Sequence, residues 1–165
     1  MQSVRLILSD VDGVLTDGGI SYDNQGIEIK KFHVRDGLGI KLWQQAGHKF
    51  GVLTARNSHI VKVRASELGV AIIRQGFTDK LPVAMQIIEE NHLKPENVCY
   101  IGDDLPDLPV IRSVGLGVAV ANAVNEVRSA AHYTTKTQGG QGAVRELIEL
   151  ILTTQKRWSE LLAQY

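Results

Sequence analysis

The sequence of 165 residues has one cysteine, so no disulfide can form within a single chain. Its formal net charge is zero, which gives no indication of a broad surface for nucleic acid or an anionic membrane. No apolar run is long enough to span a bilayer, and no secretory signal precedes the first predicted strand. We therefore expect one cytoplasmic domain, residues 1–165, that binds neither nucleic acid nor membrane.

Two carboxylates follow the first apolar run. Residues 4–8 are mostly Val, Leu and Ile, as in a strand buried on both faces, and Asp10, Asp12 and Gly13 come directly after it. Buried carboxylates are costly unless they are paired, and a hard cation such as Mg²⁺ is a suitable partner. The alternative is an ordinary exit from a strand, with Asp and Gly as turn residues.

Apolar strand patterns alternate with helical patterns along the rest of the chain. This alternation predicts an α/β fold, a doubly wound (Rossmann-like) parallel sheet with helices on both faces. Further strands are expected at 50–53, 70–73, 98–101, 116–120 and near 133. Helices are expected at 37–46, 60–68, 82–91, 108–113, 123–130 (with Asn122 as its N-cap) and 143–162.

Residues 19–34 have a different pattern. Two short alternating runs flank a turn that contains Asn24 and Gly26, which predicts a β-hairpin insertion. The remaining gaps leave no room for a cap domain. An isolated hairpin is marginally stable and has unpaired edges, so we expect association with another subunit to cover it.

Polar residues end several of the predicted strands. In a parallel sheet these ends meet at one edge, where ligands bind. The side chains expected there are Asp10, Asp12, Thr54, Asp103 and Asp104, with Lys80 from the loop after the third core strand. Clustered carboxylates repel one another without a metal, and the lysine is useful if more negative charge arrives. This combination indicates Mg²⁺ together with a phosphate group.

The order Asp10-Val-Asp12-Gly, Thr54, Lys80 and Gly-Asp103-Asp104 resembles the four motifs of the haloacid dehalogenase superfamily of phosphohydrolases. The resemblance implies that Asp10 is the nucleophile and that Asp12 is the general acid and then the general base. It also implies that Thr54 and Lys80 hold the phosphoryl oxygens.

The same resemblance implies a metal site. Mg²⁺ would be bound by the Asp10 side chain, the Asp12 carbonyl and Asp103. Asp104 would order a metal-bound water or Lys80. Asp107 would either support the metal, or cap the following helix and hold the loop that carries Asp103 and Asp104.

Several stretches are similar to a capless, tetrameric branch of this superfamily that acts on sugar-acid phosphates. They are residues 10–18, 32–37, 54–56, 102–107 and 139–146. This likeness implies a homotetramer in which a neighbouring subunit completes each active site. The implied substrate contacts are His33, Val34, Arg35, Asp36, Gly37, Arg56 and Arg64, together with Asp12 and Lys80. Arginine is suited to a carboxylate because it binds in a bidentate manner.

The resemblance also bears on the substrate, because related phosphatases that act on nine-carbon sugar-acid phosphates tend to have glutamate where this chain has Arg56. It therefore implies an eight-carbon sugar acid, used in lipopolysaccharide precursor synthesis, rather than a nine-carbon one. Three positions depart from the pattern of this branch. Ala55 stands where glycine is usual, His33 where asparagine is usual, and Lys41 where arginine is usual. Taken singly, Arg35, Arg56 and Arg64 could instead be surface ion-pair partners. A non-catalytic partner of a sugar-nucleotide synthetase is the other alternative, but a binding module has no need of both Asp10 and Asp12.

Overall fold

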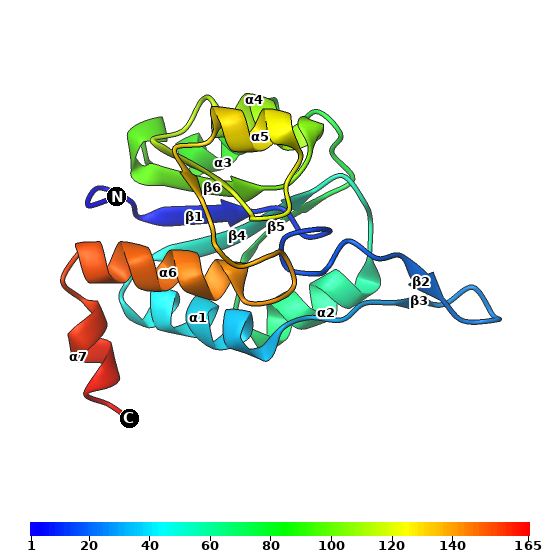
Figure 1. The fold of residues 1–165 in the computed structure, drawn as a ribbon, viewed down its shortest axis with the longest axis horizontal. Helices are drawn as coiled ribbons and strands as arrows, with labels where there is room; N and C mark the ends of the chain where they lie inside the picture. The colour runs from blue at the N-terminus through cyan, green and yellow to red at the C-terminus, as the bar shows by residue number, and fades with distance from the viewer.

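The computed structural model describes residues 1–165 and contains a six-stranded parallel sheet (Figure 1). Its strands are β1 (Leu6–Ser9), β4 (Lys49–Thr54), β5 (Ile72–Gln75), β6 (Val98–Gly102), β7 (Leu116–Ala119) and β8 (Tyr133–Thr134). Their order is β5-β4-β1-β6-β7-β8, so β1 lies between β4 and β6. The sheet order reverses beside β1, which is where a doubly wound sheet binds its ligands.

Helices cover both faces of the sheet. They are α1 (Val34–Gln45), α2 (His59–Glu67), α3 (Lys80–Glu90), α4 (Leu108–Ile111), α5 (Asn125–Ala130), α6 (Ala143–Thr154) and α7 (Trp158–Leu162). Helices α1, α2 and α6 lie on one face, and α3, α4 and α5 lie on the other (Figure 1). The predicted doubly wound α/β fold is confirmed. No helix has both the length and the apolar character needed to cross a bilayer.

The central strand β1 is fully apolar except for its last residue, Ser9, and all its residues are buried. The buried apolar side chains of the chain form one cluster of 41 residues around it. Burial on both faces requires helices above and below, and the connections between the parallel strands supply them. The strand therefore has a fixed position from which its C-terminal end presents Asp10.

The predicted hairpin is present and projects from the body of the molecule (Figure 1). Its strands β2 (Ser21–Tyr22) and β3 (Glu28–Ile29) are antiparallel and shorter than predicted. The turn is fixed by Asp23, whose carboxylate accepts hydrogen bonds from the backbone N–H groups of Gln25 and Ile27. Aspartate commonly stabilises turns in this way.

The single C-terminal helix predicted for residues 143–162 is wrong, because the structure divides it into α6 and α7. Lys156 has a positive φ of 60°. The N–H groups of Lys156 and Arg157 donate to the carbonyls of Thr153 and Leu152, which is the Schellman pattern. Lysine stands where glycine usually does, so no local pattern in the sequence marks the end of α6.

Other boundaries also differ from the prediction. Asn122 is not the N-cap of α5, since its side-chain oxygen accepts a hydrogen bond from the N–H of Gly139 instead. Helix α1 begins at Val34, ahead of the predicted Gly37, because His33 caps it. Strand β5 is displaced towards Gln75 and is only half-buried, as befits the edge of the sheet.

Candidate active site

The predicted polar residues meet at the carboxyl edge of the sheet. Asp10 follows β1, Thr54 ends β4, and Asp103 follows β6, while Lys80 is the first residue of α3. Asp10, Thr54 and Lys80 are buried, with 7%, 3% and 3% of their surface exposed. The sheet topology thus brings together residues that are far apart in the sequence.

The Lys80 ammonium lies between two carboxylates. Its Nζ is 2.9 Å from Asp10 Oδ1 and donates to Asp107 Oδ1 at 2.6 Å. Asp107 Oδ1 also accepts a hydrogen bond of 2.6 Å from the hydroxyl of the fully buried Tyr100. Buried charges require this kind of pairing.

Asp107 also holds the loop that carries the other carboxylates. Its Oδ2 accepts hydrogen bonds from the backbone N–H groups of Asp103 (2.9 Å) and Asp104 (3.2 Å). Asp104 itself is exposed, and its side chain caps the 3₁₀ turn Leu105–Asp107. The carboxylate of this loop that pairs with Lys80 is therefore Asp107, and the structure shows no contact between Lys80 and the predicted Asp104.

The acidic cluster fits a divalent cation. Oxygens of Asp10, Asp103 and Asp107 lie within 4.8 Å of one another. Asp103 Oδ1 is buried and has no hydrogen-bond partner. Burial and the neighbouring carboxylates raise the pKa of Asp10 to about 6 and that of Asp103 to about 8. A hard cation would relieve this repulsion and favour the ionised carboxylates, so these residues suit Mg²⁺.

Lys80 remains a cation in this cluster. Burial lowers its pKa, but the charges of Asp10 and Asp107 outweigh burial, so the pKa is raised overall. A permanent ammonium beside Asp10 provides attraction for an incoming phosphate dianion. This is the electrostatic requirement for a carboxylate to approach phosphorus.

The loop after β1 packs tightly against other segments. Gly13 has a φ of 94°, and a Cβ there would be 2.1 Å from Asp103 Oδ2. A Cβ on Gly139 would be 1.7 Å from the Gly13 carbonyl oxygen. Only glycine permits these approaches.

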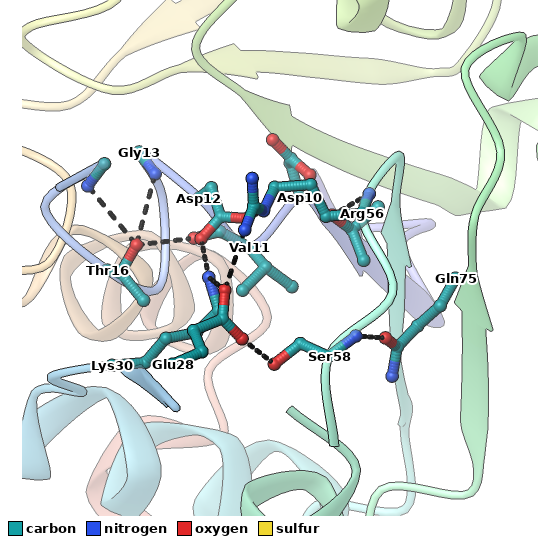
Figure 2. Close-up of polar contacts among 12 residues, drawn as sticks. Asp10, Val11, Asp12, Gly13, Thr16, Glu28, Lys30, Arg56, Ser58 and Gln75 are labelled. Atoms are coloured by element: carbon teal, nitrogen blue, oxygen red, sulfur yellow. Dashed lines mark hydrogen bonds and ion pairs between the residues drawn. The ribbon is translucent and has the colours of Figure 1, made fainter. Parts of the chain in front are cut away.

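A second cluster surrounds Asp12 (Figure 2). Lys30 donates to Asp12 Oδ1, and Arg56 Nε is 3.6 Å from Asp12 Oδ2. Glu28 accepts from Arg56 at 2.9 Å and from the Ser58 hydroxyl at 2.6 Å. The hairpin therefore reaches back to Asp12 within the same chain.

Glu28 and Lys30 are not among the site residues predicted from the sequence. Two charged residues spaced i, i+2 on a strand point to the same side, and this spacing was the available signal. It was not decisive, because a charged face on a hairpin is ordinary. What makes the pair unusual is the burial of its lysine, whose side chain is only 1% exposed.

The predicted sugar-contacting residues lie in different environments. Val34 is 77% exposed, and Arg35 is exposed at the start of α1. Asp36 is 2% exposed and accepts a hydrogen bond from the N–H of Arg145, so it holds α1 against α6. Arg64 pairs with Glu67 at 3.1 Å, and one of its guanidinium nitrogens would be 2.4 Å from a Cβ on Gly37.

Residues 57–148 match the family model described as haloacid dehalogenase-like hydrolase. The 3-deoxy-D-manno-octulosonate 8-phosphate phosphatase KdsC of Yersinia pestis is 44% identical over 155 residues, which are 94% of this chain and 83% of that protein. The same-named protein of Escherichia coli K12 is 42% identical over 163 residues, 99% of this chain and 87% of that protein.

Solved structures give the same relationship. The phosphatase of that name from Moraxella catarrhalis, in complex with magnesium, phosphate and KDO, superposes with a TM-score of 0.97. It is 40% identical, with 99% of this chain and 94% of that chain covered. The cobalt-bound phosphatase from Haemophilus influenzae has a TM-score of 0.93 at 39% identity, covering 96% and 92% of the two chains.

Proposed function

Because the chain belongs to the haloacid dehalogenase-like hydrolases, we propose that it is a Mg²⁺-dependent phosphatase for 3-deoxy-D-manno-octulosonate 8-phosphate. The products are 3-deoxy-D-manno-octulosonate, a precursor in lipopolysaccharide synthesis, and phosphate. The observation that carries the proposal is the buried cluster of Asp10, Lys80 and Asp103 at the carboxyl edge of a chain so similar to phosphatases of that name.

In the first step Asp10 acts as the nucleophile. One of its carboxylate oxygens forms a bond to phosphorus, and the bond from phosphorus to the sugar oxygen breaks. The electron pair of that bond stays on the sugar oxygen, which takes a proton from Asp12. Lys80, which is 2.9 Å from Asp10, and the buried Thr54 would hold the phosphoryl oxygens.

In the second step the aspartyl-phosphate is hydrolysed. Asp12, now a carboxylate, takes a proton from water as the water oxygen attacks phosphorus. The bond from phosphorus to the Asp10 oxygen breaks, which restores the Asp10 carboxylate and releases phosphate. Asp10, Asp103 and the Asp12 carbonyl would hold Mg²⁺, which neutralises charge on the transferred group.

Recognition of the sugar acid is assigned to Arg56, Arg64 and residues 33–37. The substrate has a carboxylate besides its phosphate, and guanidinium groups bind carboxylates well. Arg56 suits this role because its Nε is buried without a hydrogen-bond partner and lies beside Asp12. The exposed Val34 and Arg35 suit contact across a subunit boundary.

We propose a homotetramer as the working assembly. The hairpin and the start of α1 expose five large apolar side chains (Ile20, Tyr22, Ile27, Ile29 and Val34). Patches of this kind commonly mark protein interfaces. Sedimentation of the purified protein at several concentrations tests the assembly, and a monomer at all of them contradicts it. Cytoplasmic location stays a prediction.

The test of the function is phosphate release over a panel of sugar phosphates. We expect the highest kcat/KM for 3-deoxy-D-manno-octulosonate 8-phosphate, and no turnover without a divalent cation. A preference for a nine-carbon nonulosonate 9-phosphate would assign the substrate to the alternative. No release from any phosphate ester would favour the non-catalytic module.

A further inference from the structure

Lys30 is a buried lysine that the proposed reaction does not use. It lies just beyond β3, in the hairpin insertion, and its side chain is 1% exposed. Its ammonium donates to Asp12 Oδ1 and lies 3.3 Å from Glu28 Oε1. Lysine is almost never buried without a specific partner, so this position has a defined electrostatic role.

Glu28 fixes the place of Lys30. Besides the ammonium, its carboxylate accepts hydrogen bonds from the Ser58 hydroxyl at 2.6 Å and from Arg56 at 2.9 Å. Ser58 is itself held, because its backbone N–H donates to the side-chain oxygen of Gln75 at 2.6 Å. The chain from Gln75 to Lys30 thus runs from the sheet into the hairpin (Figure 2).

The contact with Lys30 distinguishes the two oxygens of Asp12. An ammonium only donates hydrogen bonds, and the unprotonated oxygen of a carboxyl group is the better acceptor for such a donor. Lys30 occupies Oδ1. Oδ2 accepts no hydrogen bond from this chain, and Arg56 Nε is 3.6 Å away. The contact with Lys30 therefore favours Oδ2 as the oxygen that carries the proton when Asp12 acts as the general acid.

We infer that Lys30 is a positioning residue that orients Asp12, so that Oδ2 delivers its proton to the leaving sugar oxygen, and that Glu28 holds Lys30 in place. The inference rests on the proposed function. In the step concerned, the O–H bond at Oδ2 breaks as the bond from phosphorus to the sugar oxygen breaks. The proton joins the electron pair left on that oxygen.

This role predicts a dependence on the leaving group. A sugar alkoxide is a strong base and needs the proton, whereas a nitrophenolate is stable without it. Loss of Lys30 should therefore slow the transfer of the phosphoryl group from sugar phosphates to Asp10 much more than its transfer from p-nitrophenyl phosphate. A lysine that only anchors the hairpin would, when lost, slow both substrates to the same extent.

The experiment compares Lys30→Met with Lys31→Met as a matched control. The Lys31 side chain is 74% exposed and lies 3.8 Å from Asp17, outside both clusters. We measure kcat/KM, which reports the steps up to transfer of the phosphoryl group to Asp10, for phosphate esters whose leaving groups range from nitrophenol to a primary alcohol. For Lys30→Met we expect kcat/KM on the alcohol ester to fall about 10- to 100-fold, a part of what general-acid catalysis provides, with a change of less than about threefold on the nitrophenyl ester. Hydrolysis of the aspartyl-phosphate is common to all the esters and does not enter this ratio.

Two further variants make the test independent of folding. Lys30→Arg keeps a donor to Asp12 and should recover part of the loss. Glu28→Gln removes the charge that holds Lys30. It should also lower kcat/KM more on the alcohol ester than on the nitrophenyl ester, but by a smaller factor than Lys30→Met. Equal losses of kcat/KM on all esters in Lys30→Met and Glu28→Gln, or no loss in either, would overturn the inference. Absence of turnover in the unmodified enzyme would instead overturn the proposed function.

Discussion

Lys80 Nζ lies 2.9 Å from Asp10 Oδ1, and both side chains are buried at the carboxyl edge of the sheet. The ammonium provides a fixed positive charge at the carboxylate that the proposed mechanism uses as its nucleophile. An attacking carboxylate and a phosphate dianion repel each other, so this charge is most useful when they approach. The arrangement therefore suits phosphoryl transfer better than simple binding of a metal.

Asp10→Asn should abolish turnover. An amide is not nucleophilic enough to form the acyl phosphate, while the isosteric side chain leaves the pocket intact. Mass spectrometry of the acid-quenched protein should find no phosphorylated species in the variant. Binding of the sugar-acid phosphate, measured by calorimetry, should persist. Normal turnover would contradict the nucleophile assignment.

Stabilisation by Mg²⁺ should increase with pH. Asp10 and Asp103 have raised pKa values of about 6 and about 8, above their ordinary 3.8. The metal-free folded state therefore retains protons that the unfolded chain has lost, and these groups make it less stable as pH rises through those values. Bound Mg²⁺ would offset the unfavourable burial of the ionised carboxylates. The increase in Tm on adding Mg²⁺ should therefore be larger at about pH 8.5 than at about pH 6. Equal increases at both pH values would contradict this.

Gly13→Ala should weaken Mg²⁺ binding and activity together. Its Cβ would be 2.1 Å from Asp103 Oδ2, and the φ of 94° is strained for any other residue. The control is Gly26→Ala, which has a similar φ of 78° but no atom within 4 Å of the added Cβ. Titration with Mg²⁺ should show a higher Kd in the first variant and an unchanged Kd in the second.

Tyr100→Phe should destabilise the protein and lower kcat. It removes the 2.6 Å hydrogen bond that holds Asp107, and hydrogen bonds to charged groups contribute about 1.5–3 kcal/mol. Tyr133→Phe is the control, since it removes a hydrogen bond to Glu146. Urea unfolding should show a loss in both variants, whereas kcat should fall only in Tyr100→Phe.

The sequence was sufficient for the fold because each buried strand is a short apolar run bounded by clear turn residues. It also located Asp10, Thr54, Lys80 and Asp103, since these residues directly follow strands or begin a helix. The carboxyl ends of parallel strands necessarily share an edge. Periodicity and topology were therefore sufficient to predict that these four residues lie together.

The contacts of Glu28 and Lys30 could not be predicted in the same way. They depend on how the hairpin folds back on Asp12, which no local pattern determines. The end of α6 was missed for another reason. Lys156 adopts a left-handed conformation that favours glycine, and it does so because the surrounding hydrogen bonds compensate.

The close approach of Gly139 to Gly13 has a consequence for biosynthesis. The loop that presents Asp10 is made early during translation, but the segment around Gly139 that supports it is made much later. A nascent chain in which only the first of these segments has left the ribosome therefore exposes its acidic motif before the pocket is complete. We expect phosphatase competence to appear only once the Gly139 segment can pack against Gly13.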